Sequence, residues 1–465
     1  MTTADRQQTT AGSWALLGSV VPKDAHIVSL LRSAGAVVLG KSNLDEWAGM
    51  RGSTYSPGYS ARGGQCRNPY NLHKSPEGSS NGSAVSVSAN IVPLAFGTET
   101  DTSIIGPAMV NGVVGIKPTV GLTSRGGIIP ISSTQDSLGP YGRTVADAAL
   151  ALDIIAGPDP DDPHSTVPER RQPPSYHALL TDRHALKGAT FGLPRNRCWD
   201  LAPRQQRKVV EQVLTWLTAA GATIIDVELP CAEERLHKDG RWDWERYGET
   251  DPAKSEITIS KVETYDLMRR YLSTLRNTPM QSLEDIVRYN DENEGSEGGP
   301  AGTHPAFPDG QKLFRKCVET KGIYDETYRA AKAHCATQCR TNGIDAALSH
   351  TEPSTNQKRT LDGLLFCDIK MAGVCIAAQA GYPVISIPAG VDDHGIPVAL
   401  TIQHSAWEEG RLVKWASAIE DLIRHERGNR GWEARATPKF REHLAKNVPV
   451  EYAWRYPGAP KYGTS

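Results

Sequence analysis

Apolar positions along the chain follow two patterns, helical spacing and short continuous runs. Residues 24–35 carry apolar side chains at helical spacing between Asp24, a capping residue type, and Gly35, which favours a helix end. An apolar run at residues 36–39 follows directly. The same order recurs at residues 209–227. The pattern predicts helices that each lead into a short buried strand.

Further short apolar runs are bounded by glycine or polar turns, and they come from both halves of the chain. The pattern therefore predicts one α/β domain over residues 1–465 instead of separate amino- and carboxy-terminal domains. Helices that alternate with short apolar strands favour a central mixed, mostly parallel β-sheet with helices on both faces. The runs lie at residues 92–96, 112–116, 384–387 and 398–402.

Residues 231–340 have a mostly helical and strongly charged pattern, and the glycine-rich interruption at 294–300 is typical of a mobile loop. We expect this part to form a helical layer or lid on the substrate side. Its larger apolar side chains would either shape a substrate pocket or pack in a core, and packing is the more common role at helical spacing. They are Tyr265, Leu272, Phe307 and Phe314.

Composition and charge narrow the classes of protein. Of the 465 residues, 39% are hydrophobic and 22% are charged, and the formal net charge is −2. These values are typical of a water-soluble globular protein, and no basic stripe is present that would neutralise nucleic-acid phosphates. The chain has no apolar run long enough to cross a membrane and no apolar signal-peptide core. We expect a cytoplasmic protein that binds neither nucleic acid directly nor a membrane.

The cysteines argue against a metal site. The eight of them are dispersed and form no C-x-x-C pair, so neither a zinc site nor a disulfide framework is predicted. Cys335 and Cys339 are four residues apart on a predicted helix and fit ordinary thiols. The sequence predicts neither a metal nor a cofactor.

Residues 76–143 combine hydroxyl side chains, glycine-bounded turns and short apolar runs, and we interpret them as the core of the functional site. Residues 78–82 fit G-x-S-x-G, which would make Ser80 the nucleophile of a hydrolase elbow. That elbow follows a buried strand, whereas residues 70–76 form a polar segment. This context disfavours Ser80 as a nucleophile.

The alternative is that these glycines and serines open a helix whose first amides and hydroxyls face a common pocket. Ser103 follows a predicted strand and a polar turn, so two neighbouring strand-end loops would bring Ser79 and Ser103 into contact. A serine needs a proton acceptor to attack a carbonyl. A chain from hydroxyl to hydroxyl to neutral lysine supplies one without a histidine.

The order and spacing of these motifs resemble those of the amidase signature family. The resemblance covers nearly the whole chain and implies the amidase signature fold. The motifs are GSSNGS at 78–83, GTETDTS at 97–103, GIKPT at 115–119, GRTVADA at 142–148, AGYP at 380–383 and GIPV at 395–398.

The resemblance implies a role for several residues. Ser103 would be the acyl-enzyme nucleophile, and Ser79, usually preceded by a cis peptide bond in this family, would be the bridging serine. Backbone amides would form an oxyanion hole, where the loss of one donor commonly costs about 3 kcal/mol. These amides belong to Thr100, Asp101, Thr102 and Ser103. Residues that match supporting positions are Ser80, Asp136 and Arg143.

Three departures from the family pattern matter, one of which is that Ile105 stands where many members of the family have arginine. The catalytic lysine of the family lies in a Lys-Asp-Asn segment that would fall a few residues before Met1, so we expect an amino-terminally truncated chain. Lys41 and Lys117 match other positions of the family. Asp101 and Thr102 replace a pair of glycines, and a β-branched residue must either avoid positive φ or carry strain of about 1–3 kcal/mol.

Three functions follow from this pattern. The first is an amidase that hydrolyses the C–N bond of a small carboxamide, as a monomer or homodimer. The second is a catalytically inactive amidase-like protein that lacks the general-base lysine. The third is a glutaminase similar to the ammonia-producing subunit of an amidotransferase, which would need partner subunits. The compartment of a longer form, including secretion, stays open.

Overall fold

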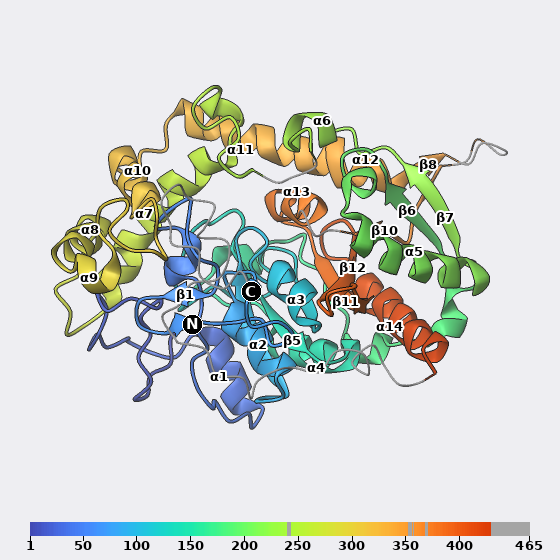
Figure 1. Ribbon diagram of the computed structural model, residues 1–465, viewed down its shortest axis with the longest axis horizontal. Coiled ribbons are helices and arrows are strands. Elements are labelled where there is room, and N and C mark those ends of the chain that lie inside the picture. The colour runs from blue at the N-terminus through green and yellow to red at the C-terminus, as the bar shows by residue number, and fades with distance from the viewer. Residues whose placement is uncertain (240–242, 352–355, 357, 368–370, 429–465) are drawn as a thin grey trace.

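An eight-stranded sheet runs through the centre of the protein (Figure 1). The computed structural model describes residues 1–239, 243–351, 356, 358–367 and 371–428. The strands lie side by side in the order β3-β5-β4-β11-β12-β10-β6-β7. Their bounds are Leu94–Glu99 (β3), Val114–Lys117 (β4), Ser137–Gly142 (β5), Thr190–Pro194 (β6), Thr223–Val227 (β7), Gly363–Phe366 (β10), Val384–Val391 (β11) and Pro397–Gln403 (β12).

The sheet is mixed, as predicted, but it is mostly antiparallel, so the expectation of a mostly parallel sheet is wrong. Only the pairs β10–β6 and β6–β7 are parallel; the other five neighbouring pairs are antiparallel. Strands β11 and β12 are joined by a short turn, and such a connection forces an antiparallel pair. Apolar runs predict that strands exist, but they carry no information on strand direction.

Helices cover both faces of the sheet and bury two apolar clusters against it. The first face is covered by α1 (His26–Ser33), α4 (Val145–Ile155), α5 (Arg204–Ala219) and α14 (Glu409–Glu426). The second face is covered by α2 (Asn81–Ser88), α3 (Ile105–Asn111), α12 (Asp345–Leu348) and α13 (Ala372–Ala380). The prediction of a sheet between two helical layers is confirmed.

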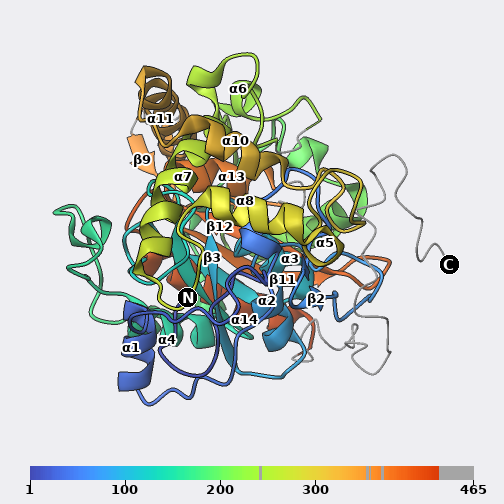
Figure 2. The same cartoon turned by 90° about the vertical axis from the view of Figure 1, so that its left-hand side faces the viewer.

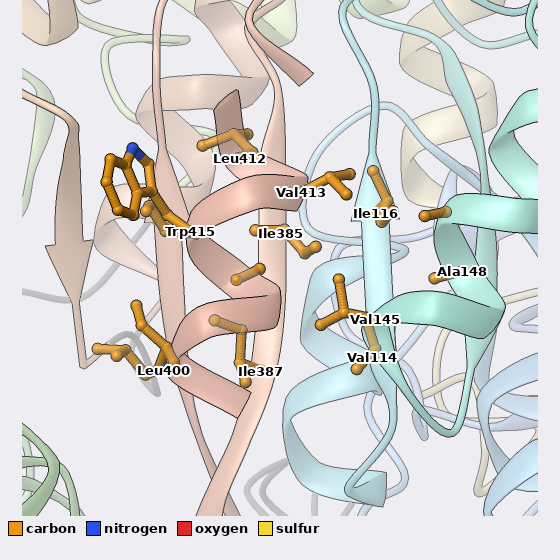
Figure 3. Close-up of a cluster of buried hydrophobic side chains, with 14 of the residues drawn as sticks. Val114, Ile116, Val145, Ala148, Ile385, Ile387, Leu400, Leu412, Val413 and Trp415 are labelled. Atoms are coloured by element: carbon orange, nitrogen blue, oxygen red, sulfur yellow. The ribbon is translucent and has the colours of Figure 1, made fainter. Parts of the chain in front are cut away.

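Alternation along the central strands divides the side chains between these two layers. Ile385 and Ile387 join the first cluster, whereas Val384 belongs to the second. Figure 3 shows Ile385 next to Val413 of α14, and Leu400 farther along the same layer. Successive residues of a strand point to opposite faces, so a sheet covered on both sides needs apolar residues throughout its central strands.

A third group of helices covers one end of the molecule, and its last member, α11, runs from there along the top of the molecule in the view of Figure 1 (Figures 1 and 2). Leu272 and Phe314 from this group are buried in a separate apolar cluster, and Phe307 lies in another, so these side chains pack as core. The Tyr265 hydroxyl donates to Glu284. The group comprises α7 (Glu256–Thr274), α8 (Leu283–Glu292), α9 (Glu294–Glu297), α10 (Lys312–Thr320) and α11 (Glu326–Cys339).

Shorter elements connect these layers. Two small hairpins pair β1 (Tyr59–Ser60) with β2 (Gly64–Gln65) and β8 (Ser349–Thr351) with β9 (Lys358–Thr360). None of the described helices is long and apolar enough to span a bilayer. Short helical elements are α6 (Ala232–Arg235), the 3₁₀ turns Glu46–Gly49, Pro163–Thr166, His177–Leu179, Arg183–Leu186, Trp199–Leu201 and Pro252–Lys254, and the π turn Arg340–Ile344.

The first predicted helix is present, but two details around it are wrong. The residue at its N-cap is Ala25, and Asp24 instead accepts a hydrogen bond from the Ala4 N–H at 2.6 Å. Residues 36–39 form no strand, and Val37 and Leu39 are 87% and 68% exposed. An apolar run becomes a buried strand only where a neighbouring strand pairs with it.

Candidate functional site

The turns that carry Ser79 and Ser103 lie against each other. Ser79 precedes helix α2, and Ser103 follows the end of strand β3. The Ser80 N–H donates to the Ser103 carbonyl at 3.1 Å, which joins the two turns through the main chain. The Tyr141 hydroxyl, from β5, donates to the same carbonyl at 3.3 Å and to the Ile104 carbonyl at 2.9 Å. Two segments separated in the sequence thus form one site.

The Ser79 turn contains a cis peptide bond between Gly78 and Ser79. Ser79 is 3% exposed. Its carbonyl accepts hydrogen bonds from the Asp45 N–H at 3.0 Å and from Asn81 Nδ2 at 3.1 Å. Two hydrogen-bond donors, from Asp45 and Asn81, therefore fix the backbone of Ser79.

Ser80 has a different environment from its neighbour. Its hydroxyl donates to the Thr98 carbonyl at 3.0 Å and accepts from the Thr98 N–H at 3.1 Å. Gly97 lies beside it, where a Cβ atom would meet Ser80 Cβ at 2.7 Å. Ser80 therefore links the start of α2 to strand β3.

The loop before Ser103 contains an unusual backbone conformation. Thr102 has φ of 64°, so this β-branched residue adopts the left-handed conformation that is unfavourable for it. The Ser103 hydroxyl donates to the Asp101 carbonyl at 3.3 Å. Of the two alternatives predicted for this loop, the chain adopts the strained one.

Glu99 binds the backbone that follows Ser103. Its Oε2 accepts from the Ile104 N–H at 2.6 Å and the Ile105 N–H at 2.9 Å, at the start of α3. Burial raises the pKa of this carboxyl, and the nearby Lys117 ammonium and the backbone amides, that of Thr102 included, oppose the rise. A carboxylate at a helix N-terminus satisfies amides that have no intrahelical partner.

Asp136 supports the same loop from the side. Its Oδ1 accepts from the Thr100 hydroxyl at 2.6 Å, and its Oδ2 accepts from the Ile131 N–H at 2.8 Å. Burial raises the pKa of Asp136 to about 6. Gln135 Nε2 donates to the Thr100 carbonyl at 3.2 Å. Asp136 therefore links Thr100 of the loop to the segment that begins at Ile131.

Arg143 lies at the other end of the sheet from the serines. Strand β5 begins with Ser137 opposite Glu99 and ends with Gly142 opposite Leu94. Arg143 follows this far end, is exposed, and donates to Asn90 Oδ1 at 2.9 Å. Six strand residues at about 3.3 Å each separate it from the loop that carries Ser103. The fold does not bring Arg143 to the site.

The two lysines matched to other family positions are engaged away from Ser79. Lys41 Nζ donates to the Met1 carbonyl at 2.5 Å and to the Thr9 hydroxyl at 3.0 Å. Lys117 is fully buried, and its Nζ donates to the Tyr382 carbonyl at 2.7 Å. Burial lowers the pKa of each to about 8.

The helical group at residues 231–340 is hydrogen-bonded to residues 132–135, next to Asp136. Glu263 of α7 accepts from the Ser132 and Ser133 hydroxyls at 2.5 and 2.8 Å. Glu256, at the start of α7, accepts from Gln135 Nε2 at 2.6 Å. Helix α7 therefore holds the segment that leads into β5 and carries Asp136.

Several residues that build the site were not predicted from the sequence. Asp45 and Asn81 hold the Ser79 carbonyl, Glu99 holds the start of α3, and Gln135 links the loop to α7. Each is a buried polar side chain in a turn or at an element end. A single sequence gives no signal that separates such residues from exposed polar ones.

Within the described parts of the chain, no group of three or more histidine, cysteine, aspartate or glutamate side chains is arranged to hold a metal ion. The polar groups around the serines instead bond to backbone and to one another. The arrangement suits acyl transfer, in which a hydroxyl attacks a carbonyl beside backbone donors.

Comparison with known proteins agrees with the motifs. The model of the Amidase family matches residues 2–288. A Schizosaccharomyces pombe relative named as an amidase is 46% identical over 450 residues, which cover 96% of this chain and 75% of that protein. An Arabidopsis thaliana relative, also named as an amidase, is 36% identical over 428 residues, or 91% of this chain and 75% of that protein.

Solved structures show the same fold. Native peptide amidase from Stenotrophomonas maltophilia is 40% identical, with a TM-score of 0.78 over 91% of this chain and 81% of that chain. The family match spans more than half of the sequence and includes both serines. The chain therefore belongs to the amidase family of hydrolases.

Proposed function

We propose that this protein hydrolyses the amide bond of a small carboxamide through an acyl-enzyme on Ser103. The observation that carries the proposal is the 3.1 Å contact between the Ser80 N–H and the Ser103 carbonyl, which brings the Ser79 and Ser103 turns together. Ser103 is partly exposed, so a substrate carbonyl can approach it. Ser79 would relay the proton that Ser103 loses.

In the proposed reaction, Ser103 Oγ bonds to the substrate carbonyl carbon, its proton passes to Ser79 Oγ, and Ser79 gives its own hydroxyl proton to the substrate nitrogen. The C–N bond then breaks, and the protonated nitrogen leaves as ammonia or an amine. Water attacks the ester on Ser103: its hydroxyl group completes the carboxylic acid, and its proton returns through Ser79 to Ser103 Oγ. The amides of residues 100–103 would stabilise the oxyanion. The Thr102 amide also faces Glu99, so it would be shared between the two groups.

Asp136 would support this reaction by fixing Thr100, and Ser80 by fixing the start of α2. The helical group that includes α7 would cover the substrate side, because Glu263 and Glu256 fasten it beside the catalytic loop. A similar solved protein is named a peptide amidase. Peptide carboxamides therefore belong in the substrate panel beside simple aliphatic and aromatic carboxamides.

A fluorophosphonate probe followed by mass spectrometry tests the nucleophile. The expected adduct lies on Ser103 and is absent from the Ser103→Ala variant. An adduct on Ser80 or another hydroxyl would contradict the assignment. Ammonia release from the carboxamide panel then measures turnover on the same preparation.

The second candidate function is an amidase-like protein that binds an amide without turnover. It is favoured by the contacts of Lys41 and Lys117, since neither ammonium bonds to Ser79 in the described chain. Specific labelling of Ser103 without ammonia release would support this candidate. Ammonia release at a rate that depends on Ser103 would reject it.

The third candidate is an ammonia-producing subunit of a larger complex. The corresponding subunit of glutamyl-tRNA(Gln) amidotransferase from Carboxydothermus hydrogenoformans is 32% identical over 430 residues, or 89% of this chain and 80% of that protein. The structure of its Thermotoga maritima counterpart has a TM-score of 0.63, below the 0.78 of the peptide amidase. Glutamine hydrolysis together with co-purification of two further subunits would favour this candidate over a stand-alone amidase.

A further inference from the structure

Asp45 lies fully buried beneath the Ser79 turn. Its backbone N–H donates to the Ser79 carbonyl at 3.0 Å. Its carboxyl oxygen Oδ1 accepts from Asn81 Nδ2 at 2.8 Å, and the same Nδ2 donates to the Ser79 carbonyl at 3.1 Å. The carbonyl of Ser79 is therefore held by Asp45 both directly and through Asn81.

The carboxyl of Asp45 is also fixed on its other sides. The Gly58 N–H donates to Oδ1 at 2.5 Å, which ties the carboxyl to the segment before β1. Oδ2 lies against Gly78, where an added Cβ atom would meet it at 1.7 Å. Asp45 thus packs against both Gly78 and Ser79. Any larger residue at position 78 would collide with the Asp45 carboxyl, so this position accepts only glycine while Asp45 stays in place.

The surroundings of this carboxyl make its burial costly. Burial raises the pKa of Asp45 to about 7; the Glu77 carboxylate adds to the rise, and hydrogen bonds from Gly58, Tyr55 and Asn81 oppose it. Among the described residues no cation bonds to this carboxyl, and a buried carboxyl without such a partner costs free energy that a purely apolar filling would avoid. Such groups often occur at functional sites.

We propose that Asp45 is a positioning residue for Ser79: its backbone N–H and its carboxyl, acting through Asn81, fix the Ser79 carbonyl so that the Ser79 hydroxyl faces Ser103. The inference rests on the proposed function, because it assigns Ser79 the relay. The sequence motifs around the two serines do not include Asp45. Asp45 is connected to the proposed reaction by its contacts with the Ser79 carbonyl and with Asn81.

The test compares Asp45→Ala with Asp45→Asn. Asparagine keeps an oxygen at Oδ1 for Gly58 and Asn81, and it nearly preserves the side-chain volume against Gly78. Alanine removes both contacts. We expect Asp45→Ala to lower the rate of fluorophosphonate labelling at Ser103 and kcat by about 10²-fold with little change in KM, because small displacements of catalytic groups cost that much. Asp45→Asn should restore most of the rate.

A double-mutant cycle tests the path through Asn81. If Asp45 acts through Asn81, Asp45→Ala combined with Asn81→Ala should lose little more than the worse single variant. Additive losses would overturn that path. Asp159→Asn is the matched control, since Asp159 is another buried carboxyl, bonded to Ser124 away from the serine pair. It should alter the thermal midpoint without altering the labelling rate.

Two results would overturn the inference. One is labelling of Asp45→Ala at the wild-type rate, and the other is an equal loss in Asp45→Ala and Asp45→Asn. If wild type is not labelled at Ser103, the proposed function fails first. Crystal structures of the variants then decide the inference alone: a displaced Ser79 side chain in Asp45→Ala supports it, and an unmoved one rejects it. Asn81→Ala gives the same comparison if Asp45→Ala does not fold.

Discussion

The backbone N–H of Ser80 and the carbonyl oxygen of Ser103 are 3.1 Å apart, in hydrogen-bond contact. The bond uses main-chain atoms only, so it joins the two turns whatever side chains they carry. Ser79 and Ser103 can therefore be replaced without removing the link that brings their turns together. Variants at these two positions should report on chemistry more than on folding.

Ser103→Ala should lower the labelling rate and any amide hydrolysis by about 10³-fold or more, because the nucleophile is lost. Ser79→Ala should give a loss of similar order through the relay. The free energy of unfolding should change by less than about 1 kcal/mol in either variant, as for most small substitutions that leave the core intact. Stopped-flow labelling and urea unfolding on the same samples measure the two effects.

Ser88→Ala is the control for this pair. Ser88 ends helix α2, and its hydroxyl bonds to Tyr70 at 3.2 Å, away from Ser103. Its labelling rate should equal that of wild type. A Ser103→Ala protein that still turns over carboxamides at the wild-type rate would reject Ser103 as the nucleophile.

Thr102→Gly should stabilise the protein. Thr102 has φ of 64°, and a strained residue of this kind costs about 1–3 kcal/mol, whereas glycine adopts the conformation freely. Glycine also gains freedom in the unfolded chain, at a cost of about 0.5–1 kcal/mol, so the net gain should be about 1 kcal/mol. Urea unfolding measures the change.

Thr98→Gly is the control for Thr102→Gly, and it should change the free energy of unfolding in the opposite direction. Thr98 lies in strand β3 without a positive φ, so glycine there relieves no strain and should destabilise by about 1 kcal/mol. Equal destabilisation by both substitutions would show that the Thr102 conformation carries no strain.

The central elements of the fold could be predicted from the sequence because burial on both faces demands continuous apolar runs. The runs at 384–387 and 398–402 became β11 and β12 for that reason. The run at 36–39 is also apolar, yet Val37 and Leu39 are exposed. Strand pairing and strand direction depend on contacts between segments that are distant in the sequence. The local pattern of apolar residues carries no information about such contacts.

The candidate site divides in the same way. Ser79, Ser103 and Asp136 carry motif resemblance, and the fold places them around one loop. Arg143 carries equal resemblance but follows the far end of β5. Asp45 reaches the site because its segment bonds to the Ser79 turn through the main chain, from the Asp45 N–H to the Ser79 carbonyl and from the Gly82 N–H to the Asn43 carbonyl. Motifs identify residues that are close in sequence to the two serines. The residues that hold the two turns in place come instead from distant segments, which only the fold brings together.

The stability of the protein should depend on Asp136 in a defined pH range. Burial raises the pKa of Asp136 from its usual 3.8 to about 6. A group that binds its proton more tightly in the folded state gives its full stabilisation below the lower value and loses it as pH rises to the upper value. The free energy of unfolding of wild type should therefore fall between pH 4 and 6 relative to that of Asp136→Asn.

The expected slope of that difference is about 1.4 kcal/mol per pH unit, and the difference should be constant above about pH 6. Urea unfolding of both proteins at closely spaced pH values measures it. Parallel curves through this range would show that Asp136 does not titrate with a raised pKa.

Arg51 fastens the amino-terminal segment to the residues between α9 and α10, and its loss should be severe. The guanidinium is 1% exposed, bonds to Glu46 and to the Gly298 carbonyl, and lies 3.8 Å from the centroid of the Phe307 ring. Arg51→Met leaves the buried Glu46 carboxyl without its cation, which costs about 3–5 kcal/mol. Adding Glu46→Gln should recover much of that loss, since it removes the Glu46 charge that Arg51 neutralises.

Arg315→Met is the control for Arg51→Met, because it breaks the half-exposed ion pair between Arg315 and Asp291. It should cost no more than about 1 kcal/mol by thermal and urea unfolding, since solvent screens such a pair. Equal losses in Arg51→Met and Arg315→Met would mean that burial of the Arg51 pair contributes nothing beyond an ordinary surface ion pair.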